Sequence, residues 1–160
     1  SDFEKPTWLL AQIGWESSAA DYFKAKTLIH RAARDVADFF EDHDLFVGSA
    51  LAQPPARIGE MLPSGAERLQ LDALRWMPLK RLLDIALNQI GKGKLSYTPN
   101  TQLFNLTGQP AMSVPLYWNK RALPIGVQFA APFGREGLLF RMAAQLEEAR
   151  PWADKRPPIG

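Results

Sequence analysis

The fold of this 160-residue chain is decided by the stretch Asn-Leu-Thr-Gly-Gln-Pro-Ala-Met-Ser-Val-Pro at residues 105–115 and its continuation Leu-Pro-Ile-Gly-Val-Gln-Phe-Ala at residues 123–130. Gly108 favours the left-handed backbone that ends a helix, and Pro110 prevents the helix from continuing. The pattern therefore predicts a helix over 99–107, strands over 111–114 and 124–130, and a turn at Asn119-Lys120 between them. Gly126 is expected where a neighbouring backbone comes close.

The residues before this stretch predict helices and one more strand. Apolar spacing predicts a helix over 5–15 ended by Gly14, and a longer one over 18–40, with Ser18 and Asp21 as a capping box. The run 44–50 is too short for a helix and predicts a short buried strand. Residues 66–90 predict two helices divided at Pro78. Residues 91–94 predict the loop that ends the second of them.

A last helix is expected over 135–150, where Pro151 stops it. Helices that alternate with short strands are typical of an α/β fold. Because no Pro- or Ser-rich linker and no internal repeat divides the sequence, we expect residues 1–160 to form a single unit.

Composition excludes several classes of function. The net charge is +2, from 19 basic and 17 acidic residues without a basic cluster, so nucleic acid is not an expected partner. No apolar run approaches the roughly 20 residues that span a bilayer, so a membrane is not expected either. There is no cysteine, which excludes disulfides and thiolate chemistry. We expect a cytoplasmic location.

The sequence contains no recognisable catalytic centre. The two histidines, His30 and His43, are thirteen positions apart and are not at metal-ligand spacing. The run Gly-Lys-Gly-Lys at 91–94 is not a phosphate loop, because its glycines do not have the required spacing before the lysine and no Ser or Thr directly follows it. No serine lies in a nucleophile elbow. We therefore expect no catalytic residue, metal ligand or cofactor within these residues.

The spacing of the C-terminal segments resembles the amidase signature family. The resemblance is specific over residues 105–115, 123–129 and 146–152, and softer upstream, at residues 34–40, 44–47 and 54–56. The final segment looks most like the bacterial amidases related to 6-aminohexanoate-cyclic-dimer hydrolase. The resemblance implies the C-terminal part of the amidase signature fold, with mixed sheet strands flanked by helices.

The resemblance also implies a function for the intact enzyme. In this family a Ser–cis-Ser–Lys triad, in an N-terminal half with a Gly-Gly-Ser-Ser-Gly-Gly type motif, hydrolyses the C–N bond of a carboxamide. No residue here matches those positions, so the N-terminal catalytic half is expected to be absent, and the chain to be inactive alone. Ser1 is hypothesised to be a cut in a longer chain. The substrate would be a small-molecule amide, and Thr101, Phe104 and Asn105 are the candidate substrate-binding residues.

Two other functions remain open. The chain could be a stand-alone, non-catalytic binding or interaction module, which a gene encoding only this segment would favour. It could also belong to the related amidotransferase A-type subunit that acts on charged tRNA, although the ending Glu-Ala-Arg-Pro-Trp at 148–152 points away from that. In each case the apolar strands near Val47, Val114 and Val127 predict self-association or a homo-oligomer.

Overall fold

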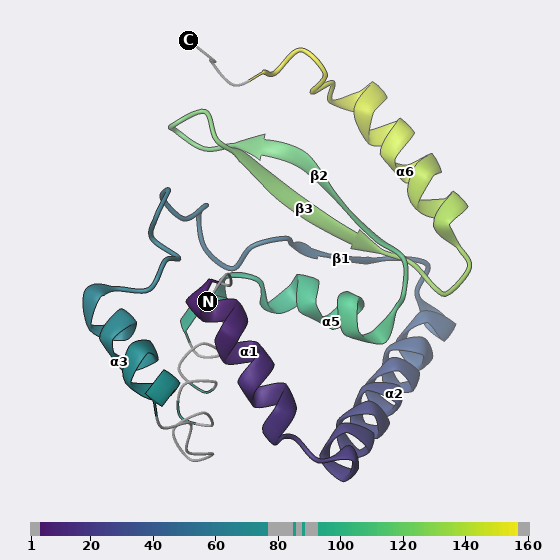
Figure 1. Cartoon of the computed structure of the whole chain (residues 1–160). Coiled ribbons are helices and arrows are strands. Elements are labelled where there is room, and N and C mark those ends of the chain that lie inside the picture. Colours follow the sequence, from purple (N-terminus) through teal and green to yellow (C-terminus); the bar gives the residue numbers. More distant parts are fainter. Residues whose placement is uncertain (1–3, 77–84, 86–87, 89–92, 157–160) are drawn as a thin grey trace. The chain divides into compact units, whose positions relative to one another are not determined.

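The structure, a computed structural model, describes residues 4–76, 85, 88 and 93–156 (Figure 1). Its internal contacts group the chain into two units, one formed by residues 1–26 and 56–96 and the other by residues 27–55 and 97–160. None of the helices in the described ranges is long and apolar enough to cross a membrane.

The first unit holds two packed helices, α1 (Lys5–Glu16) and α3 (Gly65–Trp76). Leu9, only 1% exposed, packs with Trp8 and Ile13 of its own helix and with Leu71 of α3. This confirms the predicted apolar stripe of the first helix. The helix runs two residues past Gly14, so the prediction that Gly14 ends it is wrong; a single glycine inside a helix costs only about 1 kcal/mol.

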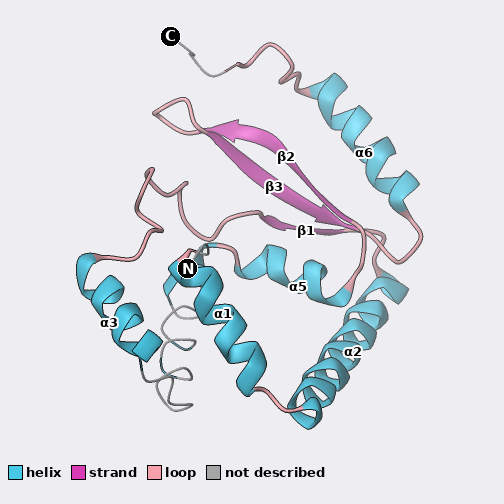
Figure 2. Cartoon of the chain, in the orientation of Figure 1, coloured by secondary structure: helices cyan, strands magenta, loops and turns pink. Residues whose placement is uncertain are grey.

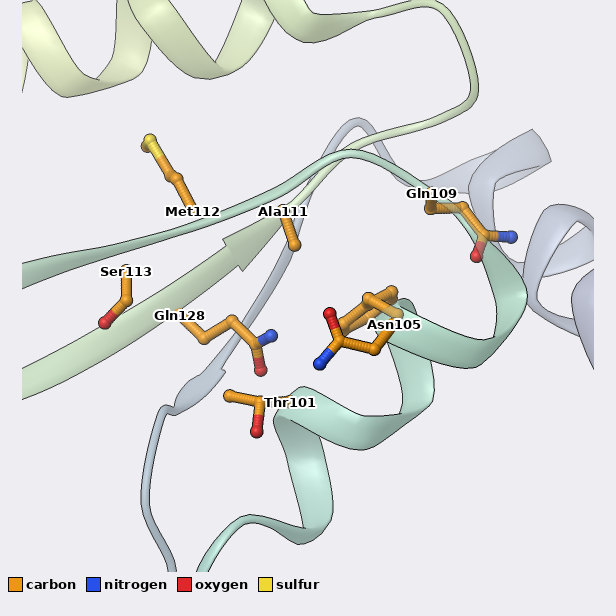
Figure 3. Close-up of a pocket in the computed structure, with 8 residues that line it drawn as sticks. Thr101, Asn105, Gln109, Ala111, Met112, Ser113 and Gln128 are labelled. Carbon is orange, nitrogen blue, oxygen red and sulfur yellow. The ribbon is translucent and has the colours of Figure 1, made fainter. Parts of the chain in front are cut away.

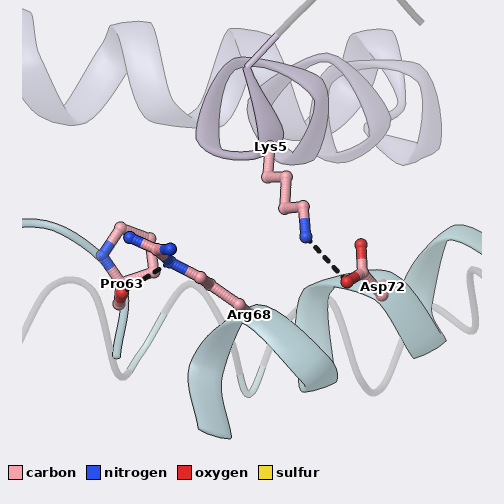
Figure 4. Close-up of polar contacts among 4 residues, drawn as sticks. All are labelled: Lys5, Pro63, Arg68 and Asp72. Carbon is pink, nitrogen blue, oxygen red and sulfur yellow. Dashed lines mark hydrogen bonds and ion pairs between the residues drawn. The ribbon is translucent and has the colours of Figure 1, made fainter. Parts of the chain in front are cut away.

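One ion pair also joins these two helices, and a second polar contact lies at the start of α3. Lys5 Nζ lies 2.7 Å from a carboxylate oxygen of Asp72, and Arg68 Nε donates to the Pro63 carbonyl at 3.0 Å (Figure 4). Both side chains of the ion pair are nearly half exposed, so it contributes little, in the range of about 0–1 kcal/mol. α3 is described as far as Trp76; the predicted boundary at Pro78 and most of the second predicted helix lie outside the described residues.

The long helix α2 (Ala19–Asp42) begins at the predicted capping box. The Asp21 backbone N–H donates to Ser18 Oγ at 3.1 Å, and the Ser18 hydroxyl donates to the Asp21 carboxylate at 2.7 Å. None of the 24 residues of α2, all of them described, is buried. The apolar residues that recur along one side of α2, from Tyr22 through Ile29 to Phe40, are half-buried at Ile29 and Phe40 but exposed at Tyr22, so the helix is only partly covered.

The second unit is built on a three-stranded antiparallel sheet in the order β1-β3-β2. Its strands are β1 (Phe46–Ser49), β2 (Ala111–Trp118) and β3 (Pro124–Ala130), which confirms β3 and the start of β2 as predicted. β2 continues four residues further than expected, with an irregularity in the register between Pro115 and Tyr117. Proline is tolerated here because β2 is an edge strand of the described sheet.

The first strand is not buried as the sequence predicts. Val47 is 56% exposed, although its partner across the ladder, Phe129 of β3, is buried. The burial of a strand depends on what covers it, and β1 lies at the edge of the described sheet. An apolar run alone does not carry that information.

Helices lie on opposite faces of this sheet (Figure 2). On one face α6 (Glu136–Ala149) packs Leu139 against Val114, Phe129 and Ala131 to form the hydrophobic core. On the other face lies α5 (Pro99–Thr107), which follows the 3-10 helix η1 (Lys94–Tyr97). Residues 93 and 94 are helical rather than the predicted loop.

Two glycines stand at positions where a side chain would be strained or crowded. Gly108 has φ = 87°, the left-handed C-cap that the sequence predicts, and its N–H donates to the Phe104 carbonyl at 2.8 Å. At Gly126 a Cβ would overlap the Ser113 hydroxyl and lie 3.1 Å from Ala50 Cβ. A Cβ here would thus meet side chains, while the expected neighbouring backbone is that of Ala50, whose N–H donates to the Gly126 carbonyl at 3.1 Å.

The turn between β2 and β3 lies where the sequence predicts it. The Asn119 side-chain oxygen accepts hydrogen bonds from the backbone N–H of Arg121 at 2.9 Å and of Leu123 at 3.1 Å. Ala122 has φ = 57°, a left-handed conformation that these bonds hold in place. The turn fixes the register of the hairpin, and therefore which residues of β3 face α5.

Candidate functional site

A pocket of about 370 Å³ opens between α5 and the face of the sheet that α6 does not cover (Figure 3). All of its lining residues belong to the second unit: Thr101, Phe104, Asn105, Gln109, Ala111, Met112, Ser113 and Gln128. They come from α5, from the turn after it, and from strands β2 and β3.

Helix α5 supplies one wall of the pocket. Thr101, Phe104 and Asn105 stand three and four residues apart, so they share one face of the helix. Thr101 Oγ1 donates to the Thr98 carbonyl at 3.2 Å. Phe104 is 4% exposed, and its ring lies 5.2 Å from that of Phe46. The three residues named from the sequence thus line a single pocket; that they bind substrate stays a prediction.

The turn after α5 supplies Gln109, whose amide is already engaged. The Thr107 hydroxyl donates to Gln109 Oε1, and Gln109 Nε2 donates to the Ala33 carbonyl of α2 at 3.2 Å. Gln109 is only 3% exposed. These bonds tie α5 to α2 within the second unit and hold this end of the pocket in position.

The sheet supplies the opposite wall, on which Ser113 of β2 stands directly across from Gln128 of β3. Gln128 is 3% exposed, and its Oε1 has no hydrogen-bond partner among the described residues. Its amide points toward Thr101 and Asn105 (Figure 3). The side chain of Met112 points the other way, toward the face where α6 lies.

The pocket can bind but offers no acid–base chemistry of its own. Its side chains are amides, hydroxyls, an aromatic ring and small apolar groups, and none of them ionises near neutral pH. Ser113 has no neighbouring base within the lining, which a serine nucleophile needs. Among the described residues, no group of three His, Asp or Glu gathers in a way that could hold a metal ion.

Neither histidine belongs to this pocket. The His43 ring stacks on Phe39 at 4.3 Å between ring centroids, and its Nδ1 donates to the Phe39 carbonyl at 3.0 Å. This contact ends α2 and gives His43 a structural role.

The residues of the sheet wall were not predicted from the sequence, because the family resemblance indicated candidate residues in α5 alone. One signal could have revealed it. Alternation along β2 and β3 places Ala111, Ser113 and Gln128 on the face opposite to Met112 and Phe129. A glutamine within an apolar strand, flanked by Val127 and Phe129, marks that face as polar.

The fold is that of an α/β unit, and its pocket has a neutral, polar lining. Residues 7–140 match the model of the family described as Amidase. Because that match extends over most of the chain, this protein belongs to the amidase family.

Individual relatives agree with this assignment. The chain is 33% identical over 130 residues to a Mycobacterium leprae (strain TN) protein named as an amidase, AmiC, which matches 81% of this chain and 23% of that protein. It is 48% identical over 67 residues to the 6-aminohexanoate-cyclic-dimer hydrolase of Paenarthrobacter ureafaciens, matching 42% of this chain and 14% of the relative. The chain thus spans less than a quarter of either relative.

A solved structure of 6-aminohexanoate cyclic dimer hydrolase matches 98% of this chain and 30% of its own, with a TM-score of 0.79 and 28% identity. The architecture is accordingly that of the C-terminal part of the amidase signature fold, as the sequence predicts.

Proposed function

We propose that this chain is the segment of an amidase that supplies one wall of the substrate pocket, and that the catalytic triad lies in sequence outside these 160 residues. The substrate is a small-molecule amide. The reaction is hydrolysis of its C–N bond by a Ser–cis-Ser–Lys triad through an acyl-enzyme, with release of an amine or ammonia.

The neutral lining of the pocket carries this proposal. A residue that attacks or protonates an amide must be an activated nucleophile or a group that exchanges a proton, and the lining contains neither. It does contain what amide recognition needs. The Asn105 amide and the Thr101 and Ser113 hydroxyls can form hydrogen bonds, while the Phe104 ring can cover an apolar chain.

Labelling with a fluorophosphonate, which reacts with activated serines, tests whether the catalytic nucleophile lies outside this chain. The purified chain is expected to show no labelling and no hydrolysis of simple amides. An authentic 6-aminohexanoate-cyclic-dimer hydrolase serves as the positive control. Labelling that disappears in Ser113→Ala would show that this chain holds its own nucleophile, and would overturn the proposal.

The coding sequence upstream of Ser1 provides an independent test. The proposal requires an in-frame segment with a Gly-Gly-Ser-Ser-Gly-Gly type motif. A start codon directly before Ser1 would instead favour a stand-alone binding module.

A further inference from the structure

The amide of Gln128 is the feature of this pocket that the fold does not use. Gln128 lies in the central strand, where Gly48 of β1 and Ser113 of β2 flank it in register. It is 3% exposed, and Oε1 is fully buried without a partner among the described residues. A buried acceptor that is left unpaired destabilises a folded chain, so a partner for it is expected.

Gln109 shows how this fold normally treats a buried glutamine. It is 3% exposed, like Gln128, but both ends of its amide are bonded, to Thr107 and to Ala33. The two glutamines line the same pocket. Of these two glutamines, Gln128 is therefore the one whose side-chain oxygen lacks a partner among the described residues.

The surroundings of Gln128 determine what could bind there. Its amide points into the space where Thr101 and Asn105 approach from α5 (Figure 3). An acceptor oxygen requires a donor from the ligand. No charged side chain lines the pocket, so an ammonium or guanidinium ligand would lose its hydration without gaining a counter-ion. A neutral N–H donor is the better match.

We propose that Gln128 is a specificity-determining residue whose Oε1 accepts a hydrogen bond from an N–H of a neutral amide in this pocket. The inference rests on the proposed function and extends it by naming the substrate class. Primary and secondary amides carry such an N–H, whereas esters and tertiary amides do not. The site therefore selects N–H-bearing amides against esters and tertiary amides of similar shape, because these would leave Oε1 buried and unpaired.

Three small probes test this selection on the 160-residue chain itself: N-methylbutanamide, N,N-dimethylbutanamide and methyl butanoate. Their affinities are measured by NMR titration of the isotope-labelled chain, following the side-chain amide signals of Gln128. N-methylbutanamide is expected to bind about tenfold more tightly than the other two probes. Equal affinities for the three probes would overturn the inference, and this comparison needs no variant.

Gln128→Met tests the same point from the side of the protein. Methionine fills a similar volume without the acceptor, so the preference among the three probes is expected to disappear. The thermal midpoint is expected to stay the same or rise, because an unpaired polar group is removed. Gln109→Met is the matched control for stability, and its midpoint is expected to fall, since it removes the two hydrogen bonds that Gln109 makes with Thr107 and Ala33. A preference that persists in Gln128→Met would refute the assignment.

Thr101→Trp separates failure of this inference from failure of the proposed function. An indole at this position fills the pocket and should weaken binding of all three probes alike. If the probes bind equally and Thr101→Trp abolishes binding, the pocket is a binding site but Gln128 does not set its specificity. If no probe binds the unsubstituted chain, both this inference and the proposed pocket wall fail.

Discussion

The two faces of the sheet in the second unit are built from alternate residues of the same strands, yet they serve different purposes. Phe129 and its neighbour Gln128 are 5% and 3% exposed. Phe129 points to the α6 face and joins Val114 and Leu139 in an apolar core, whereas Gln128 lines the pocket on the α5 face. Two equally buried neighbours thus differ: Phe129 is packed in an apolar core, whereas Gln128 keeps a side-chain oxygen without a partner among the described residues.

The α6 face should be the more sensitive to loss of volume. Leu139→Ala removes a side chain that is 5% exposed from the centre of the core, and is expected to lower the free energy of unfolding by about 2–5 kcal/mol. Urea denaturation followed by circular dichroism measures the change, or shows the loss of a cooperative transition. The control is Phe140→Ala on the same helix, where the side chain is 75% exposed. Similar effects of the two substitutions would show that this face is not the core.

The α5 face should instead be sensitive to added volume. Gly126→Ala places a Cβ against the Ser113 hydroxyl and Ala50, and is expected to cost about 1–3 kcal/mol. Adding Ser113→Ala removes the hydroxyl and should recover part of the loss, which a double-mutant cycle in urea would reveal. The matched control is Gly14→Ala in α1, where a Cβ meets nothing within 4 Å and should stabilise the helix. Additive effects at positions 126 and 113 would contradict the close approach.

The smallest effect is expected at the edge of the α6 face, where β1 leaves Val47 56% exposed. The predicted self-association of the chain would use such uncovered apolar surface. Val47→Lys should lower the average mass in light scattering at high concentration, while it changes the free energy of unfolding by no more than about 0.5 kcal/mol. A chain that is monomeric before the substitution would contradict self-association altogether.

Local signals explain which parts of the fold the sequence could predict. Gly108 and Pro110 limit the conformations of their own backbone, so the end of α5 and the start of β2 follow from residue type alone. Ser18 and Asp21 likewise bond to each other across one helical turn. Features of this kind need no knowledge of the rest of the chain.

Features that depend on distant neighbours were harder to predict. The exposure of Val47 follows from the place of β1 in the strand order, and β1 pairs with a strand some eighty positions away. The pocket joins α5 to Gln128 more than twenty residues further on, so only the folded sheet brings its two walls together. The polar side of that strand was visible in the sequence, but what faces it was not.

The proline in β2 affects whether the sheets of two copies of this protein can pair edge to edge. β2 is an edge strand of the described sheet, and the open edge of a strand invites pairing with a foreign chain. Pro115 offers no N–H to such a chain, and the irregular register between Pro115 and Tyr117 interrupts the ladder there. Growth of intermolecular β-structure, as in amyloid, should therefore be blocked at β2 and would have to begin at β1, whose four residues contain no proline.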